Sequence, residues 1–100
     1  MKRVFTAAGT AIFMSTFSAA QAGPIDNACM SSERGGNRAL CGCIQAVANI
    51  TLNGQDQRLA AKFFAEPQMA QDVRMSKTQY HDEFWKRYEQ FGATASAACS

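Results

Sequence analysis

Four cysteines are the residues of this sequence whose type and spacing could do chemistry. Cys41 and Cys43 stand one residue apart, Cys29 precedes them, and Cys99 is the penultimate residue. Thiols of this kind can pair as structural disulfides, exchange disulfides with another molecule, or bind a soft metal ion. The element that carries Cys41 and Cys43 decides which of these roles is open to them.

The stretch "RALCGCIQAVANITL" predicts an amphipathic helix around Cys41 and Cys43. Its apolar residues recur at spacings of three and four, which places one apolar face on a helix; they are Leu40, Ile44, Val47 and Thr51. Asn37 is the expected N-cap, and Asn53-Gly54 is the expected end.

Helix geometry prevents Cys41 and Cys43 from pairing with each other. At 100° per residue the two side chains point about 200° apart, so a bridge between them would require the helix to break. Two pairings remain open at this point. One joins Cys29 to Cys41 and Cys43 to Cys99, and the other joins Cys29 to Cys43 and Cys41 to Cys99.

The first 22 residues have the pattern of a secretory signal peptide. Lys2 and Arg3 precede an apolar run from Val4 to about Phe17, and small residues ending in Ala20-Gln21-Ala22 follow. The run is shorter than the roughly 20 residues that a membrane-spanning helix needs. We therefore expect cleavage after Ala22, a domain of residues 23–100, and a periplasmic or secreted location.

Cleavage would leave a neutral chain. Two of the ten Lys and Arg residues precede the cut and all eight Asp and Glu residues follow it, so eight positive charges would face eight negative ones. A neutral surface has no long-range attraction for nucleic acid or for anionic membranes. We expect neither as a partner, and no membrane span after cleavage.

A domain of residues 23–100 is short enough that a hydrophobic core alone is marginal. An even number of cysteines in a small exported chain typically forms disulfides, which supply the missing stability. We therefore interpret Cys29, Cys41, Cys43 and Cys99 as two structural disulfides that fasten both ends of the chain to the central helix.

The whole domain reads as helices, with no alternating strand pattern. We expect a small all-α bundle of four to five short helices, covering residues 24–32, 38–52, 56–66, 67–75 and about 78–91. Gly92 is the expected end of the last helix. In that helix, Asp82 with Lys86 and Glu83 with Arg87 have the spacing of ion pairs.

The aromatic residues of the last helix fall on one stripe, with Trp85 beside it; the stripe consists of Tyr80, Phe84, Tyr88 and Phe91. At helical spacing such a stripe is typical of a core. Trp85 and Tyr88 also carry polar atoms, which suit the edge of a core, so they are our candidates for a contact surface.

Other chemistry-bearing residues predict no site. His81 is the single histidine, and we expect it on a solvated helix face. Met30, Met69 and Met75 are scattered and are interpreted as core-filling residues. The sequence predicts no metal site, no cofactor and no catalytic residue.

The segments "LCGCIQAVANITL", "DQRLAAKFF" and "FWKRYEQFGATA", together with Cys99, resemble a family of short exported bacterial proteins. The function of that family is undetermined, and its members are sometimes labelled arginine transporter. The likeness covers most of residues 23–100, and the cysteine placement is its most distinctive part. It implies a periplasmic setting and, at most, a soluble accessory role in transport.

We therefore expect a non-catalytic binding or interaction module with an unknown protein or small-molecule partner. Two alternatives stay open at this point. One is a thiol–disulfide redox protein that uses Cys41 and Cys43, and the other is a soluble accessory to amino-acid transport, for instance of arginine.

Overall fold

The computed structural model describes residues 23–32 and 36–99, and the predicted signal peptide lies outside them. The described residues form five helices and no strand, which confirms the all-α prediction. The helices are α2 (Pro24–Ser31), α3 (Arg38–Thr51), α4 (Gly54–Ala65), α5 (Gln68–Met75) and α6 (Gln79–Ala98). Within these residues, no helix has both the length and the apolar character to cross a membrane.

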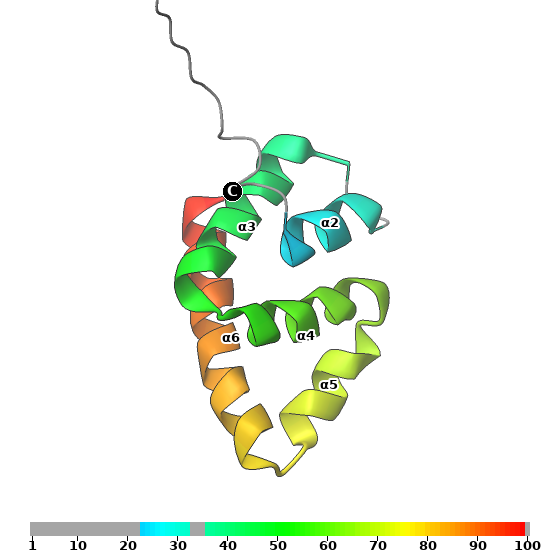
Figure 1. The fold of residues 1–100 in the computed structure, drawn as a ribbon, viewed down its shortest axis with the longest axis vertical. Helices are drawn as coiled ribbons and strands as arrows, with labels where there is room; N and C mark the ends of the chain where they lie inside the picture. The colour runs from blue at the N-terminus through cyan, green and yellow to red at the C-terminus, as the bar shows by residue number, and fades with distance from the viewer. Residues whose placement is uncertain (1–22, 33–35, 100) are drawn as a thin grey trace, which may run out of the picture.

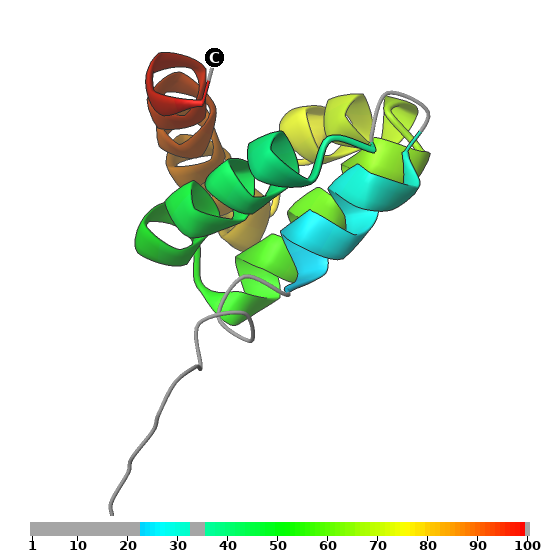
Figure 2. The ribbon, with the colours of Figure 1, turned by 90° about the horizontal axis from the view of Figure 1, so that it is seen from above.

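Helix α3 is the central element of the bundle. It packs against α2 on one side and α6 on the other, and α4 packs against α2 and α6. Figure 1 shows α6 running antiparallel to α3, with α4 crossing the middle of the molecule and α5 leading into α6. Viewed from above, α3 lies between α2 and α6 (Figure 2).

Two disulfides connect α3 to these two neighbours. Cys29 of α2 bonds to Cys41, and Cys43 bonds to Cys99 directly after α6. The number of bridges is thus confirmed, and of the two open pairings the structure has the first. The two bonds therefore join α3 to α2 and to the end of α6.

The core lies between α3, α4 and α6 and is closed by α2. Its fully or nearly buried apolar side chains come from all five helices and from the α3–α4 junction. They are Ile25, Val47, Ala48, Leu52, Ala60, Phe63, Val73, Phe84 and Phe91.

Side-chain caps fix where three of the helices begin. The Asn37 side chain accepts a hydrogen bond from the Leu40 backbone N–H at 3.0 Å, which confirms the predicted N-cap of α3. Asn53 and Asp56 form a capping box at the start of α4, and Thr78 caps α6. Leu52 is the C-cap of α3, and the next residue, Asn53, is already the N-cap of α4. Helix α4 therefore begins at Gly54, two residues earlier than predicted.

The apolar face predicted for α3 is only partly the buried one. Val47 is buried, but Ile44 and Thr51 are half-buried and Leu40 is 39% exposed. The buried face is rotated toward Cys41, Gln45 and Ala48 because the disulfide from Cys41 pulls that side toward α2.

The prediction that α6 ends at Gly92 was wrong. The helix continues through Ala98, and its cap is Cys99. Gly92 lies in ordinary helical backbone, since its φ is not positive. The residues that follow are mostly alanine, the best helix former, and the Cys43–Cys99 bond fixes their far end.

Candidate functional site

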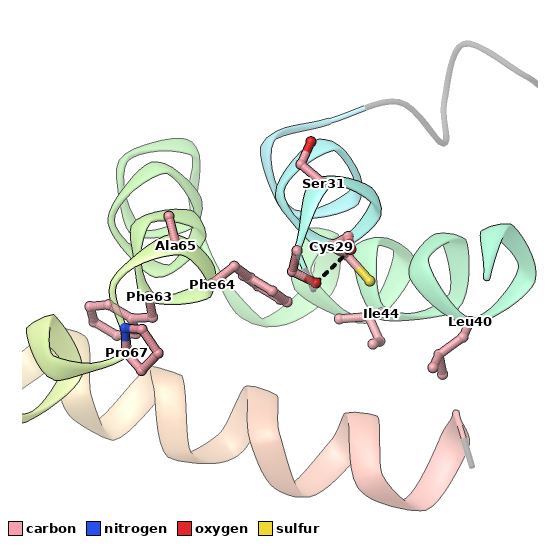
Figure 3. A pocket seen from close by; sticks show the side chains of 9 residues that line it. Cys29, Ser31, Leu40, Ile44, Phe63, Phe64, Ala65 and Pro67 are labelled. Atoms are coloured by element: carbon pink, nitrogen blue, oxygen red, sulfur yellow. Dashed lines mark hydrogen bonds between the residues drawn. The ribbon is translucent and has the colours of Figure 1, made fainter. Parts of the chain in front are cut away.

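A groove of about 640 Å³ opens where α2, α3 and α4 meet, and it is our candidate site. The last turn of α2, the first half of α3 and the end of α4 supply its walls (Figure 3). The lining residues are Cys29, Ser31, Ser32, Leu40, Ile44, Phe63, Phe64, Ala65 and Pro67.

The lining is apolar apart from two serines, and it contains no charged side chain among the described residues. One serine is already engaged, because the Ser32 hydroxyl donates a hydrogen bond to the Cys29 carbonyl at 2.9 Å. The groove can therefore hold an uncharged apolar group, with the Ser32 hydroxyl at its α2 end.

The wall from α4 is held by aromatic packing. The Phe63 ring packs edge-to-face against Phe84 and Tyr88, with ring centroids 6.0 and 5.3 Å apart. In both pairs the two ring planes are nearly perpendicular. Pro67 follows directly after the cap of α4, where its ring cannot continue the helix. The aromatic residues at this end of α4 are thus fixed before any ligand arrives.

The wall from α2 is held by a buried amide network. The Gln45 side chain is 2% exposed, and its oxygen accepts a hydrogen bond from the Asp26 backbone N–H at 2.9 Å. Its nitrogen donates to Gln57 at 2.7 Å and to Asn49 at 2.9 Å. Gln45 thereby caps α2 from α3, in place of the side chain that the N-cap Gly23 lacks.

The fit at Gly23 is close. A Cβ atom there would lie 2.6 Å from the Gln45 side-chain oxygen, so the amide occupies the space that any other residue would need. Gln45 belongs to none of the motifs that the sequence displays. The available signal was its position one turn after Cys41, on the side of α3 that faces α2.

A buried ion pair connects α4 to α6. Asp56 is 0% exposed, and both of its oxygens accept hydrogen bonds from Arg87, at 2.6 and 3.0 Å. The Tyr80 hydroxyl donates to the same carboxylate at 3.4 Å. Arg87 therefore pairs with Asp56 and not with Glu83 as predicted, because the buried carboxylate is the stronger acceptor.

The contacts in this cluster shift the pKa of Arg87 and of Tyr80. The hydrogen bond to Asp56 raises the pKa of Arg87 above its ordinary value. Burial, and then the negative charge of Asp56, raises the pKa of Tyr80. Since Arg87 already occupies the carboxylate, the cluster holds helices together and offers no free acid.

The predicted contact residues lie outside the groove lining. Trp85 is half-buried, donates a hydrogen bond to Glu89 at 3.1 Å, and lies 6.0 Å from the Arg74 guanidinium. Tyr88 is also half-buried, and its burial raises its pKa. Both pack against the core, and their role in contact with a partner stays a prediction.

His81 and the methionines are placed as follows. His81 is half-buried at the start of α6, where its ring nitrogen lies 2.8 Å from the Ser76 hydroxyl.

Met69 packs against the core as predicted, whereas Met75 is 69% exposed, which makes its interpretation as a core residue wrong. Across residues 23–32 and 36–99, no three His, Cys, Asp or Glu side chains cluster as metal ligands do.

No protein-family model matches this chain, and neither a curated protein nor a solved structure matches it.

Proposed function

We propose that this protein is a small non-catalytic binding module, and that the groove between α2, α3 and α4 receives the apolar part of its partner molecule. The groove itself is the observation that carries the proposal: a concavity of about 640 Å³ with prearranged walls, lined mostly by apolar side chains. Ligand sites of proteins are typically concave, mostly apolar and of about 300–1,000 Å³.

The lining favours an uncharged group. A charged group entering the groove would lose its hydration without meeting an opposite charge, which is costly. An aliphatic or aromatic group would instead bury surface against Ile44, Phe63 and Phe64. By the same reasoning arginine is a poorer candidate ligand, because its guanidinium binds best to a carboxylate.

The arrangement of the sulfurs bears on the redox alternative. Cys41 and Cys43 are each bonded to a different partner. Exchange between them would first require one of those bonds to be broken. Two disulfides also suit an oxidising compartment, which supports the proposal that the protein works in the periplasm or after secretion.

Titration with a neutral fluorescent probe, N-phenyl-1-naphthylamine, tests the proposed site. The Ile44→Glu variant places a carboxylate in the groove, and we expect it to bind the probe at least about tenfold more weakly than the unmodified protein. Ile50→Glu is the matched control, because Ile50 lies on the same helix but is 79% exposed and outside the groove.

Circular dichroism of both variants checks that the helices are retained. Equal binding by Ile44→Glu and Ile50→Glu would remove the groove as the binding site. Displacement of the probe by aliphatic compounds or by apolar peptides would then show which chemistry the groove prefers.

A further inference from the structure

The two disulfides differ in how accessible they are. Cys41 is 0% exposed and Cys29 is 5% exposed, whereas Cys43 and Cys99 are both half-buried. Thiol–disulfide exchange requires a thiolate to reach one of the two sulfurs. Although Cys29 lines the groove, the Cys29–Cys41 bond is the less exposed of the two, so an external thiol reaches the Cys43–Cys99 bond more readily.

The end of α6 has few other contacts to hold it. Phe91 is the last buried residue of the helix, and residues 92–98 are exposed or half-exposed. Within this segment Ala95 packs against the core, and so does Cys99, which directly follows the helix. Gly92 adds a residue of low helix propensity at the start of this segment. The disulfide is thus the main link between the end of α6 and α3.

The same end of α6 lies beside one wall of the groove. Cys43 directly precedes Ile44, and α3 and α6 are in contact. In Figure 3, the side chains of Leu40 and Ile44 point toward the ribbon of α6. Moving the end of α6 away from α3 would uncover apolar surface at this side of the groove.

We propose that the Cys43–Cys99 disulfide is a redox-sensitive crosslink: its reduction releases residues 93–98 of α6 and uncovers the Leu40 side of the groove, while Cys29–Cys41 stays bonded. The consequence for binding rests on the proposed function. The release of the helix end does not, because it follows from burial and connectivity alone.

The reductant is a dithiol, either a small molecule or a reduced dithiol protein. One of its thiolates attacks a sulfur of the crosslink, forming a mixed disulfide and expelling the other cysteine as a thiolate. Its second thiolate then displaces the bound cysteine. Overall, two electrons and two protons pass to Cys43 and Cys99, and the dithiol becomes a disulfide.

Graded reduction of the oxidised, exported protein tests the proposal. Dithiothreitol is added in steps, free thiols are blocked with N-ethylmaleimide, and peptide mapping identifies the labelled cysteines. We expect label on Cys43 and Cys99 before any appears on Cys29 and Cys41. Hydrogen exchange should then show loss of amide protection in residues 93–98, with α4 still protected.

The Cys43→Ser/Cys99→Ser variant reproduces the released state without reductant. We expect it to lack protection in residues 93–98 and to bind more N-phenyl-1-naphthylamine than the oxidised protein. Simultaneous labelling of all four cysteines, or earlier labelling of Cys29 and Cys41, overturns the proposal. Retained protection of residues 93–98 in the double variant does so as well.

The failure of the two proposals can be told apart. If Ile44→Glu binds the probe as well as the unmodified protein does, the groove is rejected as the ligand site. The labelling order and the exchange data need no ligand, so they still decide whether the crosslink controls the end of α6.

Discussion

Single polar residues decide how the helices of this protein meet. Asp56 is fully buried and serves two elements at once, since it belongs to the capping box of α4 and accepts both hydrogen bonds from Arg87 of α6. Gln45 of α3 likewise joins two other helices, since its side chain accepts a hydrogen bond from the Asp26 backbone of α2 and donates one to Gln57 of α4. Buried polar groups that are fully satisfied favour one arrangement of the helices over others, because any shift would leave them unpaired.

Removing either partner of the ion pair should destabilise the fold, but unequally. Arg87→Met would leave the Asp56 carboxylate buried without a positive charge beside it, and we expect a loss of about 3 kcal/mol in the free energy of unfolding. Asp56→Asn keeps a neutral group beside an arginine whose side chain is 35% exposed, and we expect a loss of about 2 kcal/mol. Urea denaturation measures both.

Asp72→Asn is the matched control, because Asp72 is exposed on α5. We expect it to change stability by less than about 0.5 kcal/mol. An Asp56→Asn variant as stable as this control would contradict the structural role of the pair.

At the scale of elements, the existence of each helix could be predicted because its signals are local. Asn37 as a cap and the apolar spacing of α3 need no knowledge of the rest of the chain. The end of α6 could not be predicted, because it depends on a bond between Cys99 and a residue 56 positions away. Gly92, an ordinary helix-ending signal, is overridden by that bond.

The two glycines at positions 36 and 92 should respond to substitution in opposite directions. Gly92→Ala adds a methyl group into open space in helical backbone, and we expect it to stabilise the protein by about 0.5–1 kcal/mol. Gly36 has φ +98°, which L side chains rarely adopt, so Gly36→Ala should destabilise it.

Thermal unfolding followed by circular dichroism compares these variants with the unmodified protein. A Gly92→Ala protein that is less stable would mean that α6 does not continue through this position. It would also remove the helix end on which the redox crosslink acts.

At the scale of the whole molecule, the groove could not be read from the sequence. Its walls come from segments around positions 30, 42 and 65, and only the packing of α2, α3 and α4 brings them together. The sequence did predict the structural cysteines, since their number and the helix geometry were enough to limit the pairings to two. It also predicted the aromatic stripe of α6, of which Phe84 and Phe91 are buried in the core while the other rings pack against it half-buried.

Tyr88 is half-buried and packs against that core with its aromatic ring. Its ring stacks on Phe84 at a centroid distance of 5.5 Å, meets Phe63 at 5.3 Å, and lies 5.8 Å from Phe91. The phenol is therefore shared between the core and the Phe63 wall of the groove. Its burial raises its pKa above the ordinary 10.0, so the folded state favours the neutral phenol.

This shift predicts a loss of stability at alkaline pH. Below pH 10.0, Tyr88 is neutral in both states and its contribution is fully present. As the pH rises from there through the folded pKa, the unfolded chain loses the proton first, so the free energy of unfolding falls by up to about 1.4 kcal/mol per pH unit for one linked proton. Tyr88→Phe keeps the ring and removes the proton, so its stability should fall less steeply.

Trp85→Phe is the control, because it alters the neighbouring ring without removing a phenol, and it should keep the slope of the unmodified protein. Urea denaturation at several pH values between about 8 and 11 measures these slopes. If Tyr88→Phe falls as steeply as Trp85→Phe, the phenol is not buried in the folded protein, and the packing of Tyr88 behind the groove wall is wrong.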